Sequence, residues 1–360
     1  MSSQEKIIDY LDRLKPEIDK IIEKYIPRKI SQEWLEFVFG KSNYQYTPKA
    51  AQESLINPVW DFLDRGGKRW RPSLFLLIVE AVGGNIEKVK DFSIVPELIH
   101  NGSLIIDDIE DEGELRRGKP CLHKIFGIDV AVNAGNFIYF LPSIVFKKNR
   151  NQFKTEVLLK AYEVYMQEMI NIHLGQGTDI YWHKGKAKEI NEKEYFQMCS
   201  FKTGCLSRMA AKLAVVLSEK NGEMVKKIGK VAEAIGIAFQ IQDDILDIIL
   251  EEKEREKFGK SFGNDIKEGK RSLIVIHALK NANNEDGQKL LGILNKHTED
   301  SNEIKQAVEI INKYNSVKYA KNVAKKIVQD AWKQANKLLS ESKAKERLSE
   351  FVNYLIERSV

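Results

Sequence analysis

The chain has 360 residues, 43% hydrophobic and 30% charged, so it can bury a large core and is not a disordered polymer. Lys and Arg number 57 against 52 Asp and Glu, and this net charge of +5 forms no basic tail, which argues against a nucleic-acid partner. The 3 cysteines are an odd and sparse set, which argues against a disulfide framework, and they form no CxxC pair, which argues against a zinc site.

Neither the amino terminus nor the longest apolar stretch indicates export or a membrane span. The first residues, MSSQEKIIDYLDRL, alternate charged with apolar side chains and have no signal-peptide pattern. The stretch from Val130 to Phe146 is the most apolar, but it contains Asn133, Asn136 and Pro142, so we interpret it as a buried helix. We therefore expect a cytoplasmic protein with no integral membrane span.

Apolar residues recur at three- and four-residue spacing along nearly the whole chain, which predicts an all-helical fold. One apolar stripe runs from Ile7 to Ile22 and another from Val317 to Leu338. Between and after them we expect helices over 47–64, 71–82, 89–111, 128–147, 153–176, 192–218, 222–250, 271–280, 286–296, 303–313 and 343–358. No disordered linker divides the chain, which predicts a single domain over 1–360, with 1–45 as a helical extension and 300–360 as helices packed on the same bundle.

The first motif, RGGKRWRP, combines a glycine turn with basic residues at a predicted helix start. Gly66 and Gly67 allow a tight turn, Lys68 and Arg71 are positively charged, and Pro72 is well placed to open a helix. Backbone amides at such a turn, supplemented by Lys and Arg, are typical of an anion site. Basic residues at helix starts are common, so this motif alone does not identify the anion.

Two apolar helical segments end in the same unusual pattern of aspartates. SLIIDDIED and FQIQDDILD each carry aspartates at i, i+1 and i+4, which places them together on one side of a helix. Aspartate is a poor helix-interior residue and like charges at this spacing repel, so the pattern costs stability. One copy is compatible with a charged helix end, whereas two copies favour cation sites. The six residues are Asp107, Asp108, Asp111, Asp243, Asp244 and Asp247.

Carboxylate ligands without cysteine or histidine favour magnesium or manganese over zinc, and magnesium sites with few protein ligands are commonly completed by a phosphate-bearing substrate. Arg116 and Arg117 follow the first aspartate motif closely enough in sequence to reach a diphosphate held there. Other candidate phosphate contacts are Lys202, Thr203, Lys260, Lys267 and Lys270. The last three lie in residues 251–271, the most polar segment, which we interpret as a mobile loop or as an ordinary solvated connection.

These motifs together resemble the trans-type polyprenyl diphosphate synthase family. GGKRWRP, HNGSLIIDDIEDEGELRRGKP, GQGTDI, KTG, FQIQDD and GKSFGNDIKEGK occur in the family's order, from about Gly66 to Arg271. The resemblance implies the all-α class I isoprenoid synthase fold, a single large helical bundle around a central cavity, and an assembly of two identical chains, since the family is usually homodimeric. Details such as NAGNFIYF and GQGTDIYW resemble the geranylgeranyl diphosphate synthase branch.

The resemblance also implies a role for each matching position. The two aspartate trios are expected to face each other and to bind three magnesium ions, with manganese as a substitute, around an allylic diphosphate. Isopentenyl diphosphate is expected at Gly67, Lys68, Arg71, His100 and Arg117, although a lone histidine among apolar residues is more often a core residue. The allylic diphosphate is expected at Arg116, Lys202, Lys260 and Lys270, with Thr203 and Gln240 beside the carbocation and with Gln176 and Asp179 on the intervening helix.

Product length follows from helix geometry, because one helical turn of about 5.4 Å is comparable with an isoprene unit. Gly102 and Ser103, five and four residues before Asp107, are too small to stop the chain at fifteen carbons. Ile99 lies a turn further back, and Tyr139 and Phe140 are candidates for the floor, although they also suit ordinary core packing. We predict geranylgeranyl diphosphate, with longer or shorter products as the alternative.

Two other classes of protein are less compatible with the sequence. A class I terpene cyclase would usually replace the second aspartate motif with an Asn/Ser/Glu site and would not need Gly67, Lys68 and Arg71. A noncatalytic subunit of a heteromeric synthase would typically have lost aspartates, and all six are present.

Overall fold

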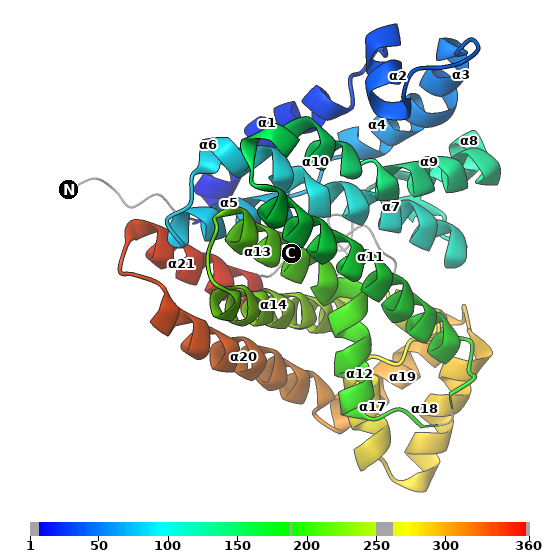
Figure 1. Ribbon diagram of the computed structural model, residues 1–360. Helices are drawn as coiled ribbons and strands as arrows, with labels where there is room; N and C mark the ends of the chain where they lie inside the picture. The colour runs from blue at the N-terminus through cyan, green and yellow to red at the C-terminus, as the bar shows by residue number, and fades with distance from the viewer. Residues whose placement is uncertain (1–6, 188, 250–261, 358–360) are drawn as a thin grey trace. The chain divides into compact units, whose positions relative to one another are not determined.

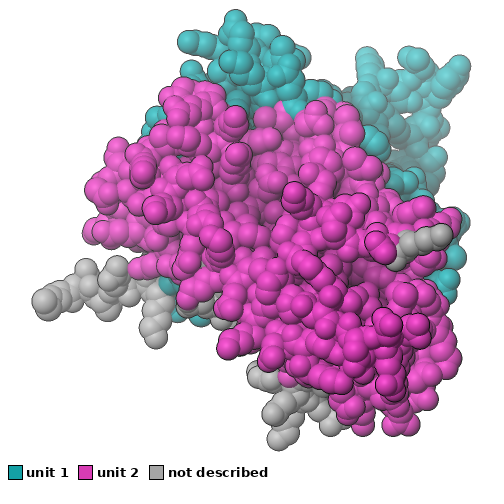
Figure 2. Space-filling model, turned by 90° about the horizontal axis from the view of Figure 1, so that it is seen from below, with its two compact units in different colours: residues 1–163, 213–220 teal, residues 164–212, 221–360 magenta. Residues whose placement is uncertain are grey.

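The computed structural model describes residues 7–187, 189–249 and 262–357, which are helical apart from turns, loops and one two-stranded hairpin (Figure 1). Its contacts group the chain into two compact units. Unit 1 is Met1–Glu163 with Leu213–Lys220, and unit 2 is Val164–Lys212 with Asn221–Val360 (Figure 2). The single domain expected from the sequence therefore stays a prediction.

Unit 1 begins with an amphipathic helix that buries one face. This helix, α1 (Ile7–Tyr25), packs on α5 and α7 and buries a stripe that includes Leu11, Leu14, Ile18 and Ile22. The elements that follow are α2 (Gln32–Phe39), α3 (Pro48–Ala51), the π-helical turn η1 (Gln52–Ile56) and α4 (Asn57–Asp64). Residues 1–45 were expected as a helical extension, and α1 and α2 account for the helical part of it.

The centre of unit 1 is formed by helices and a short turn that pack closely on each other. They are α5 (Trp70–Ala81), α6 (Ile86–Val89), the 3-10 turn η2 (Lys90–Ser93), α7 (Ile94–Glu110) and α9 (Ile128–Phe140). Helices α7 and α9 meet at two glycines: a Cβ added at Gly102 would lie 2.9 Å from the Gly135 carbonyl oxygen. The close approach fixes the end of α7, which carries the first aspartate motif.

A short hairpin follows α7, with strand β1 (Leu115–Arg116) antiparallel to β2 (Lys119–Pro120). Beyond it lie α8 (Leu122–Phe126), α10 (Ser143–Asn149) and the 3-10 turn η3 (Arg150–Gln152). By length and composition, one stretch of the described residues, Ile128–Gln152, is apolar enough to cross a membrane, and 50% of its most apolar window is buried inside the protein. Its Ala131, Ala134 and Ile138 belong to the core, as expected for a buried helix.

Two helices contribute residues to both units: α11 (Thr155–His183) and α13 (Cys205–Leu217). Unit 2 is built around α14 (Gly222–Ile249), which contacts α17, α20 and α21. The other elements among the described residues of unit 2 are α12 (Glu192–Cys199), the π-helical turn η4 (Ser200–Gly204), α16 (Asn264–Lys267), α17 (Leu273–Asn281), α18 (Asn284–Lys296), α19 (Ser301–Lys313), α20 (Ser316–Ala335), the 3-10 turn η5 (Asn336–Leu338) and α21 (Lys343–Glu357).

The predicted all-helical class is confirmed, and most predicted helices begin and end within a few residues of the observed ones. The helix expected over 192–218 is confirmed as an unbroken run from α12 to α13, except that its residues Ser200–Gly204 form the π-helical turn η4. The helix expected over 128–147 is broken at Leu141 and Pro142. The polar segment 251–271 lies partly outside the described residues. Its described part was wrongly expected to be only a loop: it contains α16, where Asp265 and Ile266 are buried.

Candidate active site

The first aspartate motif lies at the carboxyl end of α7, where a buried arginine contact holds it. Asp108 is 2% exposed, and Arg116 Nε donates to its Oδ1 over 2.7 Å. Arg116 Nη2 lies 2.5 Å from the same oxygen and 3.7 Å from Asp107 Oδ2. Burial raises the pKa of Asp108 while Arg116 lowers it, and the two carboxylates raise the pKa of Arg116 above its usual value despite burial. An acidic and a basic group are thus brought into direct contact.

The hairpin turn explains how Arg116 and Arg117 point to different partners. Arg117 and Gly118 both have positive φ, 53° and 73°, as a tight two-residue hairpin turn requires. Arg117 Nη1 donates to the Gly66 carbonyl over 2.5 Å and Nη2 to Asn101 Oδ1 over 3.3 Å. Burial lowers the pKa of Arg117 to about 10, which leaves it charged at neutral pH. The hairpin therefore joins the first aspartate motif to the glycine turn before α5.

The glycine turn brings further cations to the same region of unit 1. Gly67 has φ 137°, and a Cβ there would lie 3.2 Å from Arg69 Nη1 and 3.5 Å from Arg117 Nη2. Arg69 is tied to the fold, because it donates to Asp19 over 2.8 Å and to Glu97 over 3.1 Å. The sequence predicts Lys68 and Arg71 as anion contacts. In the structure Lys68 is exposed, whereas Arg71 is buried, with an exposed fraction of 4%.

His100, on α7, is half-buried among arginines. Burial is the main cause that lowers its pKa well below the usual value, and Arg71, Arg117, Arg116 and Arg69 lower it further. The imidazole is therefore neutral at physiological pH, and its surroundings are strongly positive. Such surroundings suit an anion, whereas a core histidine would ordinarily lie among apolar groups.

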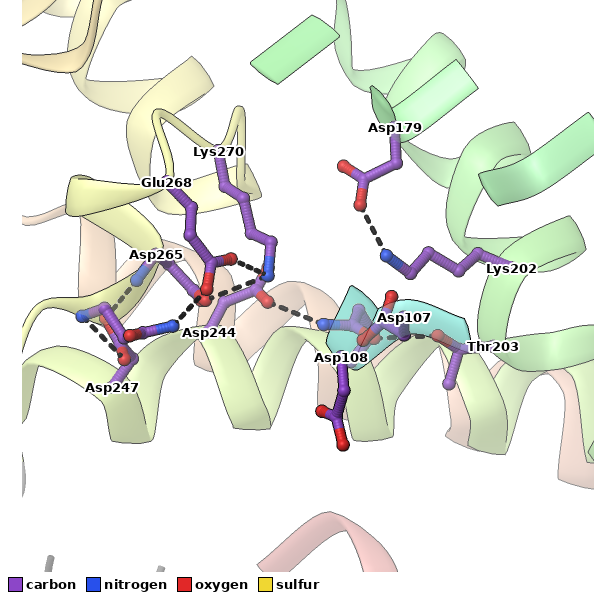
Figure 3. A network of polar contacts seen from close by, with 12 residues as sticks. Asp107, Asp108, Asp179, Lys202, Thr203, Asp244, Asp247, Asp265, Glu268 and Lys270 are labelled. Carbon is purple, nitrogen blue, oxygen red and sulfur yellow. Dashed lines mark hydrogen bonds and ion pairs between the residues drawn. The ribbon is translucent and has the colours of Figure 1, made fainter. Parts of the chain in front are cut away.

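The second aspartate motif lies on α14 in unit 2, where Asp244 and Asp247 are buried (Figure 3). Tyr195 on α12 donates its hydroxyl to Asp244 Oδ2 over 2.8 Å, and Gln240 Nε2 donates to Oδ1 over 2.8 Å. Burial, followed by the nearby Asp265 carboxylate, raises the pKa of Asp244 to about 7. Sequence reasoning missed Tyr195, because nothing in its local sequence links it to an aspartate so far along the chain.

Asp247 has a different environment, because it caps a short helix. Its Oδ1 accepts from the Asn264 backbone N–H and its Oδ2 from the Asp265 N–H, both over 3.1 Å. Lys270 lies beside this helix, 3.4 Å from Asp265 Oδ1, and also pairs with Glu268 (Figure 3). The carboxylate thus joins α14 to the start of α16.

Lys202 and Thr203 lie in the turn η4 and are each held by a neighbouring helix (Figure 3). Lys202 Nζ donates to Asp179 Oδ2 on α11 over 2.5 Å. Thr203 Oγ1 donates to Gln240 Oε1 on α14 over 2.7 Å, so one hydrogen-bonded chain leads from Thr203 through Gln240 to Asp244. These three predicted residues are brought together within unit 2.

The aspartates fit a divalent ion that a substrate completes. Asp108, Asp244 and Asp247 are buried and accept hydrogen bonds from protein donors, and Asp107, Asp111 and Asp243 are half-buried. Within the described part of the chain, no three His, Cys, Asp or Glu side chains form a ready metal cage. Magnesium retains waters and commonly binds through one or two carboxylates and substrate phosphates, so this arrangement suits it.

The structure does not support two of the positions that were expected to control product length, Gly102 and Phe140. Gly102 faces the Gly135 carbonyl and the Ile138 side chain, so its small size serves helix packing and does not open space for a product. Phe140 is 66% exposed and does not close an interior cavity of a single chain. Ile99 and Tyr139 are buried, Ser103 is half-buried, and the predicted Lys260 contact lies outside the described residues.

Comparison with known proteins identifies the class. The polyprenyl synthetase family matches residues 52–311, and the chain belongs to this family. It is a trans-prenyltransferase with the class I isoprenoid fold. The geranylgeranyl pyrophosphate synthetase from Pyrococcus horikoshii has a similar structure, with a TM-score of 0.84 and 30% identity over 98% of each chain.

Two relatives in sequence cover most of both chains. The short chain isoprenyl diphosphate synthase of Methanothermobacter thermautotrophicus is 34% identical over 306 residues, which are 85% of this chain and 91% of the relative. The geranylgeranyl pyrophosphate synthase of Dictyostelium discoideum is 34% identical over 299 residues, which are 83% and 93% of the two chains.

The neutral state of His100 predicts a pH dependence of stability. The unfolded chain takes up a proton on this residue near pH 6.5 and the folded chain does not, so the free energy of unfolding falls as the pH drops below about 6.5. Between pH 6.5 and 5.5 this residue should lower the free energy of unfolding by about 1 kcal/mol, and His100→Asn should abolish that decrease. The measurement is urea unfolding at each pH, without metal or diphosphate. The exposed His173→Asn is the control, and equal slopes for both variants would show that His100 is not held neutral.

Proposed function

We propose that this trans-prenyltransferase joins isopentenyl diphosphate to an allylic diphosphate and that its main product is geranylgeranyl diphosphate. The observation that carries the proposal is the contact of Arg116 with Asp107 and Asp108. It places a guanidinium, which suits a diphosphate, directly beside carboxylates, which suit a divalent ion. The names of the relatives support the same reaction class, although they include both a short-chain and a geranylgeranyl synthase.

Both aspartate motifs serve the ionisation of the allylic substrate. The six aspartates of the two motifs would hold magnesium, and the protein partners of Asp108, Asp244 and Asp247 also keep the carboxylate-bearing helix ends in place. We retain three ions, with manganese as a substitute, as part of the proposal. Bound magnesium supplies positive charge against which the diphosphate can leave.

The chain's own cations divide between the two substrates. Arg116, Lys202 and Lys270 bind the allylic diphosphate, whose C–O bond breaks with its electron pair going to the leaving group. Groups that stabilise charge where it develops usually lower the barrier of such a reaction more than any other effect. Lys68, Arg71, Arg117 and neutral His100 bind isopentenyl diphosphate. Its alkene pair then forms the new C–C bond, and the departing diphosphate takes the proton that is lost.

Removal of one aspartate from either motif should abolish most of the turnover. We expect Asp107→Ala and Asp243→Ala each to lower kcat by at least about a hundredfold, the loss typical of one charge-stabilising group. The assay is incorporation of labelled isopentenyl diphosphate with magnesium and an allylic primer. Asp330→Ala on the exposed surface of α20 is the control, because that carboxylate pairs only with a neighbouring lysine in the described contacts. Wild-type turnover in either motif variant would contradict the assignment.

Product length depends on the space one helical turn before Asp107. Ser103 is small and half-buried, and its hydroxyl donates to the His100 carbonyl over 2.8 Å. Ile99 is buried on the same helix, α7, and Tyr139 is buried on α9, which packs against α7. We retain both residues as candidates for the floor. Twenty carbons remains the proposed length.

A bulky side chain at Ser103 should therefore shorten the product. Ser103→Phe is expected to shift the main product from twenty to fifteen carbons, because it adds an obstacle about one turn, or one isoprene unit, above the floor. Chromatography of dephosphorylated products measures the shift. Leu104→Phe is the control, since that position is rotated by about 100° around α7. An unchanged product length in the Ser103 variant would show that this face of α7 does not control the length of the product.

We also propose that the chain is a cytoplasmic homodimer that pairs through α11. Met166, Ile170, Leu174 and Tyr181 recur at helical spacing and are 36%, 63%, 60% and 51% exposed. An exposed apolar stripe of this kind is unusual on a monomer and suits burial against an identical helix. The proposal of a dimer rests on this exposure and on the family resemblance.

A charge in the stripe should separate the subunits. Wild-type protein is expected to sediment as a dimer and Ile170→Glu as a monomer, because pairing would bury an unpaired carboxylate. Lys160→Glu, an exposed position on the same helix but outside the stripe, should stay dimeric. Sedimentation velocity decides between the two, and a wild-type monomer would rule out pairing through α11.

A further inference from the structure

The turn η4 interrupts an otherwise continuous helix where two substrate contacts are proposed. Residues Ser200–Gly204 are π-helical, between α12 and α13, and they include Lys202 and Thr203. A π-turn is less favourable than an α-helical turn and is usually retained for a functional reason. Neighbouring groups must therefore hold the backbone of η4 in place.

Two glycines enclose this turn from different helices. A Cβ added at Gly175 on α11 would lie 2.2 Å from the Lys202 backbone nitrogen and 2.5 Å from the Phe201 carbonyl carbon. A Cβ at Gly236 on α14 would lie 2.5 Å from the Gly204 Cα. These are backbone atoms, which cannot rotate away. By contrast, a Cβ at Gly177, two residues along the same helix, would meet nothing within 4 Å.

A buried ion cluster fixes the start of the turn. Arg208 Nη1 donates to Ser200 Oγ over 2.9 Å, and the same guanidinium forms two bonds to Glu168, of 2.8 Å from Nε and 2.5 Å from Nη2. Glu168 is 0% exposed and also accepts from Lys212 over 3.0 Å. The Ser200 hydroxyl in turn donates to Glu233 over 2.5 Å. Breaking a buried pair of this kind is costly, so the position of Ser200 is well determined.

We propose that Gly175 is a positioning residue for prenyl transfer: its missing side chain lets the η4 backbone lie against α11 at the place from which Lys202 reaches the diphosphate. Asp179, four residues further along α11, holds the Lys202 ammonium from the same helix. One helix thus fixes both ends of Lys202, its backbone at Gly175 and its charge at Asp179. This inference rests on the proposed role of Lys202.

The test is Gly175→Ala, measured with both substrates varied. The backbone at Lys202 must move by about 1 Å before the new methyl reaches ordinary contact, and a misplacement of that size can cost about a hundredfold. We expect kcat/KM for the allylic diphosphate to fall by about 10- to 100-fold, with the KM for isopentenyl diphosphate unchanged, because its proposed contacts lie in unit 1. Gly292→Ala in α18, where a Cβ meets nothing within 4 Å, is the matched control and should keep wild-type kinetics.

A double-mutant cycle separates positioning from a general loss of structure. If Gly175 acts through Lys202, Gly175→Ala should have no further effect in a Lys202→Met background, whereas additive losses would overturn the proposal. Gly236→Ala, which presses on η4 from α14, supplies a second variant if the first does not fold by circular dichroism. Wild-type kinetics in Gly175→Ala would also overturn the proposal. Wild-type kinetics in Lys202→Met would remove Lys202 from the proposed function, and this inference with it, while prenyl transfer by the wild-type chain would still stand.

Discussion

A concentration of arginine side chains is the constraint on which the rest of unit 1 depends. Arg69, Arg71, Arg116 and Arg117 all lower the pKa of one imidazole, that of His100. Their partial compensation comes from carboxylates such as Glu97 and Asp108, placed by α7, and from the hairpin that orients two of the arginines. Like charges repel, so the carboxylates placed among these arginines stabilise the arrangement, and an anion would suit the same surroundings.

In unit 2 the aspartates Asp244 and Asp247 are buried, and each accepts hydrogen bonds from protein donors. Asp244 receives a tyrosine and an amide, and Asp247 receives two backbone N–H groups. Hydrogen bonds to a charged carboxylate offset part of the cost of burying it. The pKa of Asp244 is nevertheless raised to about 7, which shows that the compensation is incomplete. This is the electrostatic setting in which a divalent cation is stabilising.

The helical class and the named motifs could be predicted from sequence because they depend on local periodicity and on residues that are adjacent in the chain. The ends of α7 and α14 are examples, since the apolar stripe and the aspartates lie in one segment. The contacts of Tyr195 and Arg69 could not be predicted, because their partners are far away in sequence. Gly102 was assigned to product length from its size alone, and only the packing of α9 shows why a side chain is excluded there. The turn η4 could not be predicted for a related reason: nothing in SFKTG distinguishes a π-helical from an α-helical turn, and the glycines that enclose it are far away in sequence.

The capping of α16 by Asp247 affects how substitutions in the second motif should be understood. Both oxygens of this carboxylate bind backbone amides, so its replacement would loosen the segment that carries Lys270 as well as remove a negative charge. Lost turnover in such a variant would therefore not identify a metal ligand. Asp247 therefore has a structural role besides its proposed role in catalysis, and its loss would disturb both at once.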